Sequence, residues 1–316
     1  MKKRPASSGM RAFSFGALAE SYTLCNDCYM NIRKDVLPVQ VTDLTKRFGS
    51  FTALDGVSFT VEPGETVALL GRNGAGKSTL IGCLMGFLVP DTGSVDLFSQ
   101  NVLDLPRDLR ARTGFVPQTM TGFGAFTVGK LIDYIGAFYG TLPPIDPALL
   151  RWADLDPNKI VKSLSGGQRQ RLAILLAMRH EPDFLVLDEP VASLDPHARR
   201  DFMNLLGDYA RRTGASVLIS SHILSDLERL CSRLLFLRQG QLVLDVPTTV
   251  FRATTRWLDH ATPHILSDLP FQIIGQRETG FLVHGWSEDV ILPEGTTISV
   301  PDFEDAFLEI TATRAA

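Results

Sequence analysis

The stretch Gly71-Arg72-Asn73-Gly74-Ala75-Gly76-Lys77-Ser78 matches the pattern Gly-x4-Gly-Lys-[Ser/Thr] of a phosphate loop. An apolar run, Thr66–Leu70, precedes it, and Ser78–Leu88 follows it with apolar residues at helical spacing. In such a strand–loop–helix unit, backbone N–H groups and the helix N-terminus face phosphate oxygens. Lys77 is suited to the β- and γ-phosphates, and the Ser78 hydroxyl to Mg2+. The stretch therefore predicts a site for a nucleoside triphosphate.

A second apolar run, Phe184–Leu187, ends in two acids, Asp188 and Glu189. Ligands of α/β proteins bind at the carboxyl ends of parallel strands. Asp188 is suited to holding Mg2+ through water as a hard oxygen ligand, and Glu189 is suited to polarising an attacking water molecule. Acids at a strand end are often only solvated groups, and the phosphate loop is what favours a functional role here.

A third feature is Leu164-Ser165-Gly166-Gly167-Gln168, which stands ahead of a predicted helix. By the same physics it can form a second anion cradle at a helix N-terminus. One nucleotide needs only one phosphate loop, so this second cradle suggests a nucleotide held by another copy. The alternative is an ordinary turn and helix cap.

The pattern along the chain predicts strands alternating with helices, which indicates an α/β core. We expect an N-terminal extension over 1–36, either disordered or preceding a true start at Met30, then an ATPase domain over 37–246 and a small accessory domain over 247–316. Within the accessory part, Phe303–Ile310 is an amphipathic segment. The other strands expected in the chain are Val39–Leu44, Phe51–Leu54, Val57–Val61, Ser216–Ile219, a hairpin of Leu234–Leu237 and Gln241–Leu244, Phe271–Ile274, Phe281–Val283 and Thr297–Val300.

Composition excludes several classes of function. The net charge of −4 provides no basic field for nucleic acid, so no nucleic-acid partner is expected. No apolar run is long enough for a membrane-spanning helix, and the N-terminus lacks the apolar core of a secretory signal. Cys25 and Cys28 have the spacing of half a zinc site, but no second pair completes it. We expect Cys83 and Cys231 to be buried apolar residues in a reducing setting.

Taken in order, these motifs resemble the nucleotide-binding subunit of ATP-binding-cassette (ABC) transporters. The resemblance rests on the phosphate loop, Leu164–Gln168, Val186–Pro190, Ser193-Leu194-Asp195 and a strand ending at His222, and it covers residues 37–246. The motif Leu-Ser-Gly-Gly-Gln is highly specific to that superfamily. The resemblance implies an α/β fold of the P-loop NTPase cassette type, with a mixed-sheet core, an antiparallel β subdomain and a helical subdomain. The accessory part adds a small C-terminal α+β domain.

In that family two cassettes dimerise head to tail, and each ATP lies between the phosphate loop of one subunit and the Leu-Ser-Gly-Gly-Gln motif of the other, called the signature motif, which is Leu164–Gln168 in this chain. The resemblance implies that Gln118 senses Mg2+ and the attacking water, and that Asp195 communicates across the dimer. It also implies that His222 contacts the γ-phosphate and helps to orient Glu189. Phe48 stands where the family has an aromatic residue stacked on adenine, commonly Tyr.

The complete set of expected site residues follows from these assignments. The nucleotide-binding residues are Phe48, Gly71, Arg72, Asn73, Gly74, Ala75, Gly76, Lys77, Ser78, Thr79, Ser165, Gly166, Gly167, Gln168 and Asp195. The catalytic residues are Lys77, Gln118, Glu189 and His222, and the Mg2+ ligands are Ser78, Gln118 and Asp188.

The expected partners are an integral-membrane permease and a second cassette, in a homodimer, at the cytoplasmic face of the cell membrane. Between Gln118 and Leu164 the chain is short for the family, with one helical hairpin trimmed around 143–155. Phe303–Leu308 resembles the tail of cassettes that serve small-molecule and lipid exporters with separate permeases, which favours export. The alternatives are a cassette ATPase acting on ribosomes or DNA, and a regulatory cassette that binds ATP without hydrolysing it.

Overall fold

The computed structural model describes residues 36–221, 224–260, 270–292 and 294–312, and Leu37–Ala316 belongs to one compact unit. The strands and helices are β1 (Val39–Phe48), β2 (Phe51–Val61), β3 (Thr66–Leu70), α2 (Lys77–Leu84), β4 (Thr92–Leu97), β5 (Gln100–Asn101), α3 (Arg107–Arg110), β6 (Thr113–Val116), α4 (Val128–Gly136), α5 (Pro147–Ala153), α6 (Gly166–Met178), β7 (Phe184–Asp188), α7 (Pro196–Thr213), β8 (Ser216–Ser220), α8 (Leu224–Leu230), β9 (Arg233–Arg238), β10 (Gln241–Pro247), α9 (Thr248–Thr254), β11 (Arg256–Asp259), β12 (Gln272–Arg277), β13 (Gly280–His284), β14 (Thr297–Ser299) and α11 (Phe303–Ile310). The segments predicted over 1–35, including Cys25 and Cys28, lie outside the described residues.

A mixed sheet forms the core, in the order β10-β9-β3-β8-β7-β6. All its neighbouring strands run parallel except β9 and β10, which form the predicted antiparallel hairpin. Every residue of β3, β7 and β8 is buried, as expected of strands covered on both faces. The carboxyl ends of these strands therefore meet at one edge, where the phosphate loop and the two acids follow.

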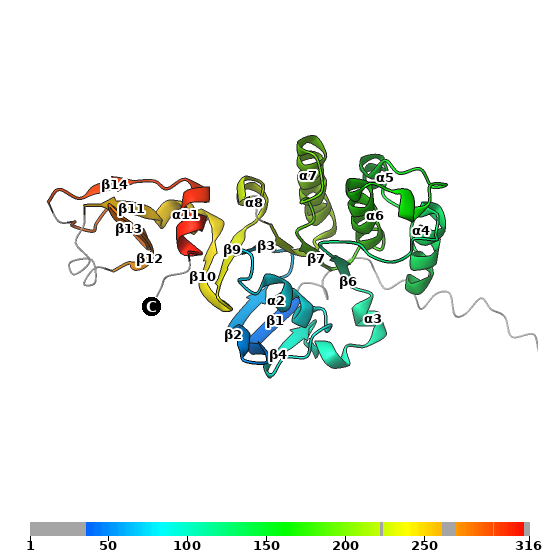
Figure 1. Ribbon diagram of the computed structural model, residues 1–316, viewed down its shortest axis with the longest axis horizontal. Coiled ribbons are helices and arrows are strands. Elements are labelled where there is room, and N and C mark those ends of the chain that lie inside the picture. The colour runs from blue at the N-terminus through cyan, green and yellow to red at the C-terminus, as the bar shows by residue number, and fades with distance from the viewer. Residues whose placement is uncertain (1–35, 222–223, 261–269, 293, 313–316) are drawn as a thin grey trace, which may run out of the picture. The chain divides into compact units, whose positions relative to one another are not determined.

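A second, antiparallel sheet has the order β2-β1-β4-β5 (Figure 1). The two strands expected over 51–61 are one strand, because β2 continues through an irregularity in its pairing with β1 near Leu54–Val57. Helix α2 lies between the two sheets, in contact with β2 and β4 on one side and β7 on the other. It ends at Leu84 rather than Leu88, since Gly86 adopts a left-handed φ of 68° that ends a helix.

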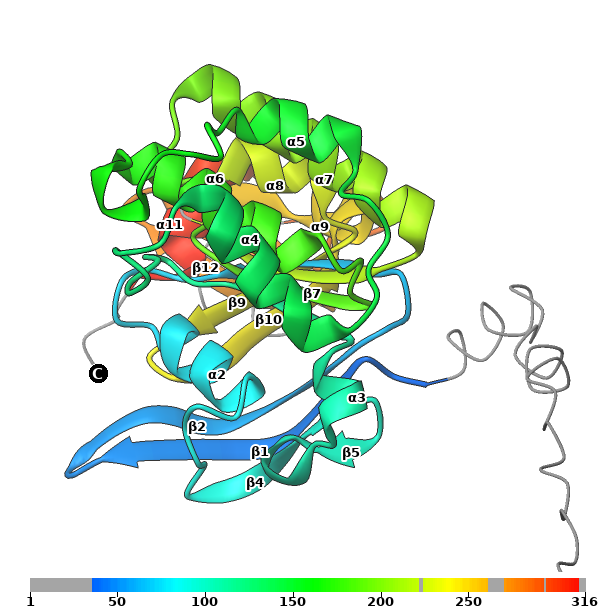
Figure 2. The same ribbon diagram turned by 90° about the vertical axis from the view of Figure 1, so that its right-hand side faces the viewer.

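Helices α4, α5, α6 and α7 cover the core sheet on the side away from the antiparallel sheet (Figure 2). Helix α4 buries Val128 and Leu131 against Leu164 and Leu172 in a small apolar cluster. In the segment expected to be trimmed, the chain forms the short helix α5, which Asp146 caps by accepting a hydrogen bond from Ala148 N–H at 2.7 Å. Cys83 and Cys231 are buried free thiols, as predicted.

The C-terminal segment forms a third sheet in the order β12-β13-β11-β14, with α11 packed on β12 and α8. The sequence did not predict β11. This part shares the main apolar core, because Phe251 stacks on Phe236 of β9 at 5.5 Å and meets Phe303 of α11 edge-on at 5.6 Å between ring centroids. Arg238 at the end of β9 also donates a hydrogen bond to the Ile310 carbonyl at 3.0 Å.

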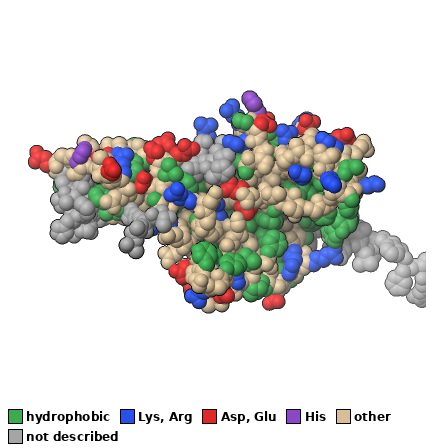
Figure 3. All heavy atoms as spheres, in the orientation of Figure 1, with side chains coloured by type: hydrophobic (Ala, Val, Ile, Leu, Met, Phe, Trp, Pro, Cys, Tyr) green, Lys and Arg blue, Asp and Glu red, His purple; other side chains and the backbone are tan. Residues whose placement is uncertain are grey.

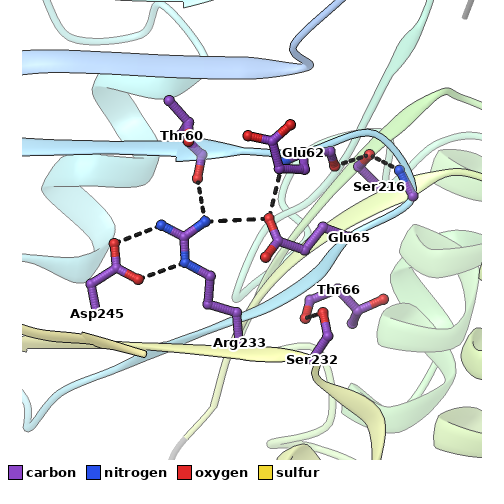
Figure 4. Close-up of polar contacts among 9 residues, drawn as sticks. Thr60, Glu62, Glu65, Thr66, Ser216, Ser232, Arg233 and Asp245 are labelled. Atoms are coloured by element: carbon purple, nitrogen blue, oxygen red, sulfur yellow. Dashed lines mark hydrogen bonds and ion pairs between the residues drawn. The ribbon is translucent and has the colours of Figure 1, made fainter. Parts of the chain in front are cut away.

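Polar contacts join the core sheet to the antiparallel sheet at the opposite end of β9 (Figure 4). Arg233 forms a two-bond ion pair with Asp245, at 2.5 and 2.6 Å, and reaches the Thr60 carbonyl at 3.3 Å. On the face of the molecule in Figure 3, basic and acidic side chains are interspersed. Among the described residues, no helix has the length and apolar character needed to cross a membrane.

Candidate nucleotide site

An open cavity of about 360 Å3 lies where the carboxyl edge of the core sheet meets the antiparallel sheet. Segments far apart in the chain build it: β2, the phosphate loop, the segment after β6 and the end of β7. Its lining residues are Phe51, Ala53, Arg72, Asn73, Gly74, Gly76, Lys77, Ser78, Thr79, Gln118, Asp188 and Glu189. The structure thus brings the predicted loop, the predicted glutamine and both predicted acids into one site.

The phosphate loop is held in shape by backbone contacts. At Gly76 φ is 110°, and a Cβ there would lie 2.6 Å from the Ala53 carbonyl oxygen, so only glycine fits. The Gly240 N–H, in the turn between β9 and β10, donates to the Ala75 carbonyl at 2.9 Å. The loop therefore packs closely against β2 on one side and is hydrogen-bonded to the β9–β10 turn on the other.

Lys77 begins α2, and its side chain is buried. Its Nζ donates to the Gly71 carbonyl at 2.6 Å and lies 4.0 Å from Glu189 Oε1. Burial lowers the pKa of this ammonium group, while the nearby Glu189 and Asp188 act in the opposite direction. A desolvated ammonium group beside an anion-binding loop is well placed to gain from phosphate oxygens.

The side-chain oxygens around Asp188 suit a Mg2+ ion. Ser78 Oγ donates to Asp188 Oδ2 at 3.3 Å, and Gln118 lines the same cavity. Mg2+ prefers oxygen ligands and usually keeps several water molecules. The Ser78 hydroxyl and the Asp188 carboxylate thus lie together beside the phosphate loop, where the hydroxyl could bind Mg2+ and the carboxylate could hold it through water. Across the described residues, no group of three or more His, Cys, Asp or Glu could hold a metal by itself.

Sequence analysis did not identify Ser220, which lies at the end of β8 and supports both acids. Its hydroxyl donates to Asp188 Oδ1 at 2.8 Å and accepts from Glu189 N–H at 2.9 Å. The only signal in the sequence was two serines after an apolar strand. That pattern is weak, because it points to this role only once the pairing of β7 with β8 is known. Phe51 and Ala53 of β2 are further lining residues that the motifs did not reveal.

Several predicted residues lie elsewhere in the described chain. Gly71 and Ala75 belong to the loop without lining the cavity, and Phe48, 48% exposed, is also outside the lining. Asp195 caps α7 by accepting from His197 and Ala198 N–H at 3.1 and 3.0 Å. The Ala198 bond is the main reason why the pKa of Asp195 is lowered. His222 lies outside the described residues.

The residues Ser165–Gln168 start α6 and do not line the cavity. Ser165 Oγ accepts from Gln168 N–H, and Gln168 Oε1 accepts from Ser165 N–H, each at 3.2 Å. This is a capping box, which satisfies two donors at the helix start. A Cβ at Gly166 would meet nothing within 4 Å, whereas one at Gly167 would lie 3.0 Å from the Ser193 carbonyl. The motif is thus an exposed helix start packed against the segment that leads to Asp195.

Comparison with known proteins identifies the family. Residues 54–192 match the family model described as ABC transporter. The chain is 37% identical over 216 residues to Nod factor export ATP-binding protein I of Burkholderia lata, covering 66% of this chain and 71% of that protein. It is 36% identical over 219 residues to the protein of the same name from Rhizobium meliloti, covering 67% and 65%.

Solved structures agree. An ATP-binding subunit of an ABC transporter superposes with a TM-score of 0.63 and 29% identity, covering 68% of this chain and 92% of that one. A dimeric ATP-binding cassette in a post-hydrolysis state, bound to ADP and Pi, gives 0.60 and 25%, covering 66% and 98%. With the phosphate loop, the two acids and the helix-capping Ser-Gly-Gly-Gln in this arrangement, the chain belongs to the ABC transporter family, as an ATP-binding subunit with the ABC ATPase fold.

Proposed function

We propose that this chain hydrolyses ATP, in a dimer of two copies, to drive export through a separate membrane permease. The observation that carries the proposal is the single cavity in which the phosphate loop meets Gln118, Asp188 and Glu189. These residues are distributed over more than a hundred positions of sequence, and the fold gathers them at one edge of the core sheet.

The proposed catalysis depends on position and charge. Lys77 and His222 neutralise charge that develops on the γ-phosphate, and Glu189, buried beside Lys77, orients the attacking water. Phe48 stacks on adenine. Ser78, Gln118 and Asp188 hold Mg2+, which screens the phosphate charge when it is bound.

Dimerisation explains the distance between the signature residues and the cavity. Ser165, Gly166, Gly167 and Gln168 present an exposed helix start that their own cavity does not use. Each copy carries both a phosphate loop and this motif, so two copies arranged head to tail form two complete ATP sites. Asp195, next to that motif, communicates between the sites. The dimeric cassette bound to ADP and Pi supports this arrangement.

The relatives named for Nod factor export support export as the direction of transport. The cargo path then belongs to a permease partner, and this chain works at the cytoplasmic face of the membrane. The aromatic side chains Phe123, Phe126, Tyr134 and Phe138 contact one another on the helical part, close in sequence to Gln118. Phe123, Tyr134 and Phe138 are exposed, and exposed aromatic rings suit contact with a protein partner.

The test is purification of tagged full-length chain from detergent-solubilised membranes, as wild type and as Glu189→Gln. We expect both to bring down an integral-membrane protein, and ATPase activity of the variant to fall at least about 100-fold while ATP binding is kept. Co-purification with ribosomes or nucleic acid, without a membrane protein, would overturn the transport function. Unchanged turnover in Glu189→Gln would overturn the catalytic assignment.

A further inference from the structure

The hydroxyl of Ser220 is fully buried at the end of β8 and holds the two acids of the ATP site in a fixed relation. It donates to Asp188 Oδ1 at 2.8 Å and accepts from the Glu189 N–H at 2.9 Å. One hydroxyl thereby uses its donor on Asp188, the last residue of β7, and an acceptor lone pair on the next residue, Glu189. It does not line the cavity, so its action on a nucleotide would pass through these two residues.

The first contact orients the Asp188 carboxylate. Ser220 engages Oδ1, while Oδ2 lies 3.3 Å from Ser78 Oγ. With one oxygen held from behind, the other is presented to the phosphate loop, where the cation site is proposed. A hydrogen bond to an ionised carboxylate is stronger than one between neutral groups, so this contact fixes the plane of the carboxylate.

The second contact acts on the backbone of Glu189, which has a φ of 49°. A residue other than glycine keeps such a left-handed conformation only where surrounding contacts hold it. The Glu189 N–H is held twice by Ser220, by its hydroxyl at 2.9 Å and by its carbonyl at 3.2 Å. The conformation that sends the Glu189 side chain into the cavity therefore depends on Ser220.

We propose that Ser220 is a positioning residue of the ATPase reaction, which sets the orientation of both Asp188 and Glu189. This inference rests on the proposed roles of those two acids. It assigns to the serine hydroxyl an effect on turnover and on the use of Mg2+, beyond its contribution to folding.

Ser216, at the other end of the same strand, is the matched control. It is also buried, donates to the Glu62 carbonyl at 3.0 Å and accepts from Gly64 N–H at 2.8 Å (Figure 4). Replacing either serine by alanine removes one buried hydroxyl with two hydrogen bonds from β8. Only the replacement of Ser220 removes contacts to Asp188 and Glu189.

The experiment compares full-length Ser220→Ala, Ser216→Ala and Ser220→Thr. For Ser220→Ala we expect kcat to fall about 10-fold while KM for ATP stays within about threefold. The affinity that ATP gains on addition of Mg2+, measured by binding titration, should fall by about threefold, with Mg2+-free affinity unchanged. Ser216→Ala should lower Tm to a similar extent but keep kcat, and Ser220→Thr should recover most of the wild-type kcat.

Equal kcat values in Ser220→Ala and Ser216→Ala, at similar Tm, would overturn the proposal. A Ser220→Thr protein that folds like the wild type but turns over as slowly as Ser220→Ala would also overturn it. Glu189→Gln, measured in parallel, distinguishes failure of the Ser220 proposal from failure of the proposed ATPase function. If it is inactive while Ser220→Ala behaves like Ser216→Ala, only the role of Ser220 fails, whereas an active Glu189→Gln contradicts the proposed function itself.

Discussion

Two phenylalanines flank the turn between β1 and β2 and differ in their relation to the nucleotide cavity. Phe48 ends β1 with its ring exposed, and Lys46 Nζ lies 5.5 Å from the ring centroid. Phe51 begins β2, is also exposed, and lines the cavity. Either ring offers a flat π-face of the kind that stacks on a base.

We predict that Phe48→Ala weakens ATP binding about 10-fold, because stacking a base on an aromatic ring contributes about 1–3 kcal/mol. Phe48→Tyr should bind like the wild type. Fluorescence titration with ATP and with GTP measures both, and the loss should be similar for the two nucleotides because each base has a π-face. Phe51→Ala, in the same hairpin, tests the competing candidate, because Phe51 lines the cavity. A larger loss in Phe51→Ala than in Phe48→Ala would transfer the stacking role to Phe51.

At the scale of single residues, the motifs predicted the residues that line the cavity better than the residues that hold those side chains in place. The meeting of Lys77, Ser78 and Asp188 follows from a loop and an acid that both succeed buried parallel strands, which end at one edge of a sheet. The contacts of Ser220 depend instead on the register that pairs Asp188 with Ser220 across β7 and β8. No pattern within either segment fixes that register, so the sequence alone could not reveal this support.

At the scale of elements, the first turn of α6 has two roles, a helix cap and a proposed contact with a partner's ATP. Two substitutions at Ser165 can separate these roles. Ser165→Ala removes the cap and should lower the free energy of unfolding by about 1 kcal/mol. Ser165→Asp keeps a good cap and adds a charge that suits a helix N-terminus, yet the charge repels a γ-phosphate. We therefore predict that Ser165→Asp has wild-type stability in urea unfolding but has lost ATPase activity. Full activity in the aspartate variant would contradict the contact with a partner's ATP.

The three described strands that are buried along their whole length were all among the predicted elements. Continuous apolar runs such as those of β3, β7 and β8 are readily predicted as strands, because both faces of these strands are covered. The short strand β6 was not predicted, since it contains Gly114, a residue that usually indicates a loop. In the fold that glycine is required by close packing, as a Cβ there would lie 2.6 Å from the Ala177 carbonyl. The local sequence pattern cannot reveal such a close approach between distant segments.

At the scale of the whole molecule, the C-terminal sheet and α11 share one apolar core with the nucleotide-binding part. Phe251 links Phe236 of β9 to Phe303 of α11, and Arg238 holds the last carbonyl of α11. The strand that carries these contacts ends in the turn whose Gly240 N–H is bonded to the phosphate loop. Sequence analysis predicted a small accessory domain over 247–316. Because that part shares its apolar core with the nucleotide-binding part, we expect the two to unfold together.

We predict that Phe303→Ala lowers the free energy of unfolding of the whole 37–316 unit by about 3–5 kcal/mol, as removal of a buried phenyl ring does. Because the core is shared, loss of helical circular dichroism and loss of ATP binding should shift together in one urea transition. Ile291→Ala is the control, since that side chain is 90% exposed and its loss should leave the transition in place. If instead the variant loses the C-terminal structure at low urea while ATP binding keeps its wild-type midpoint, residues 247–316 unfold independently and the shared core does not make the unit cooperative.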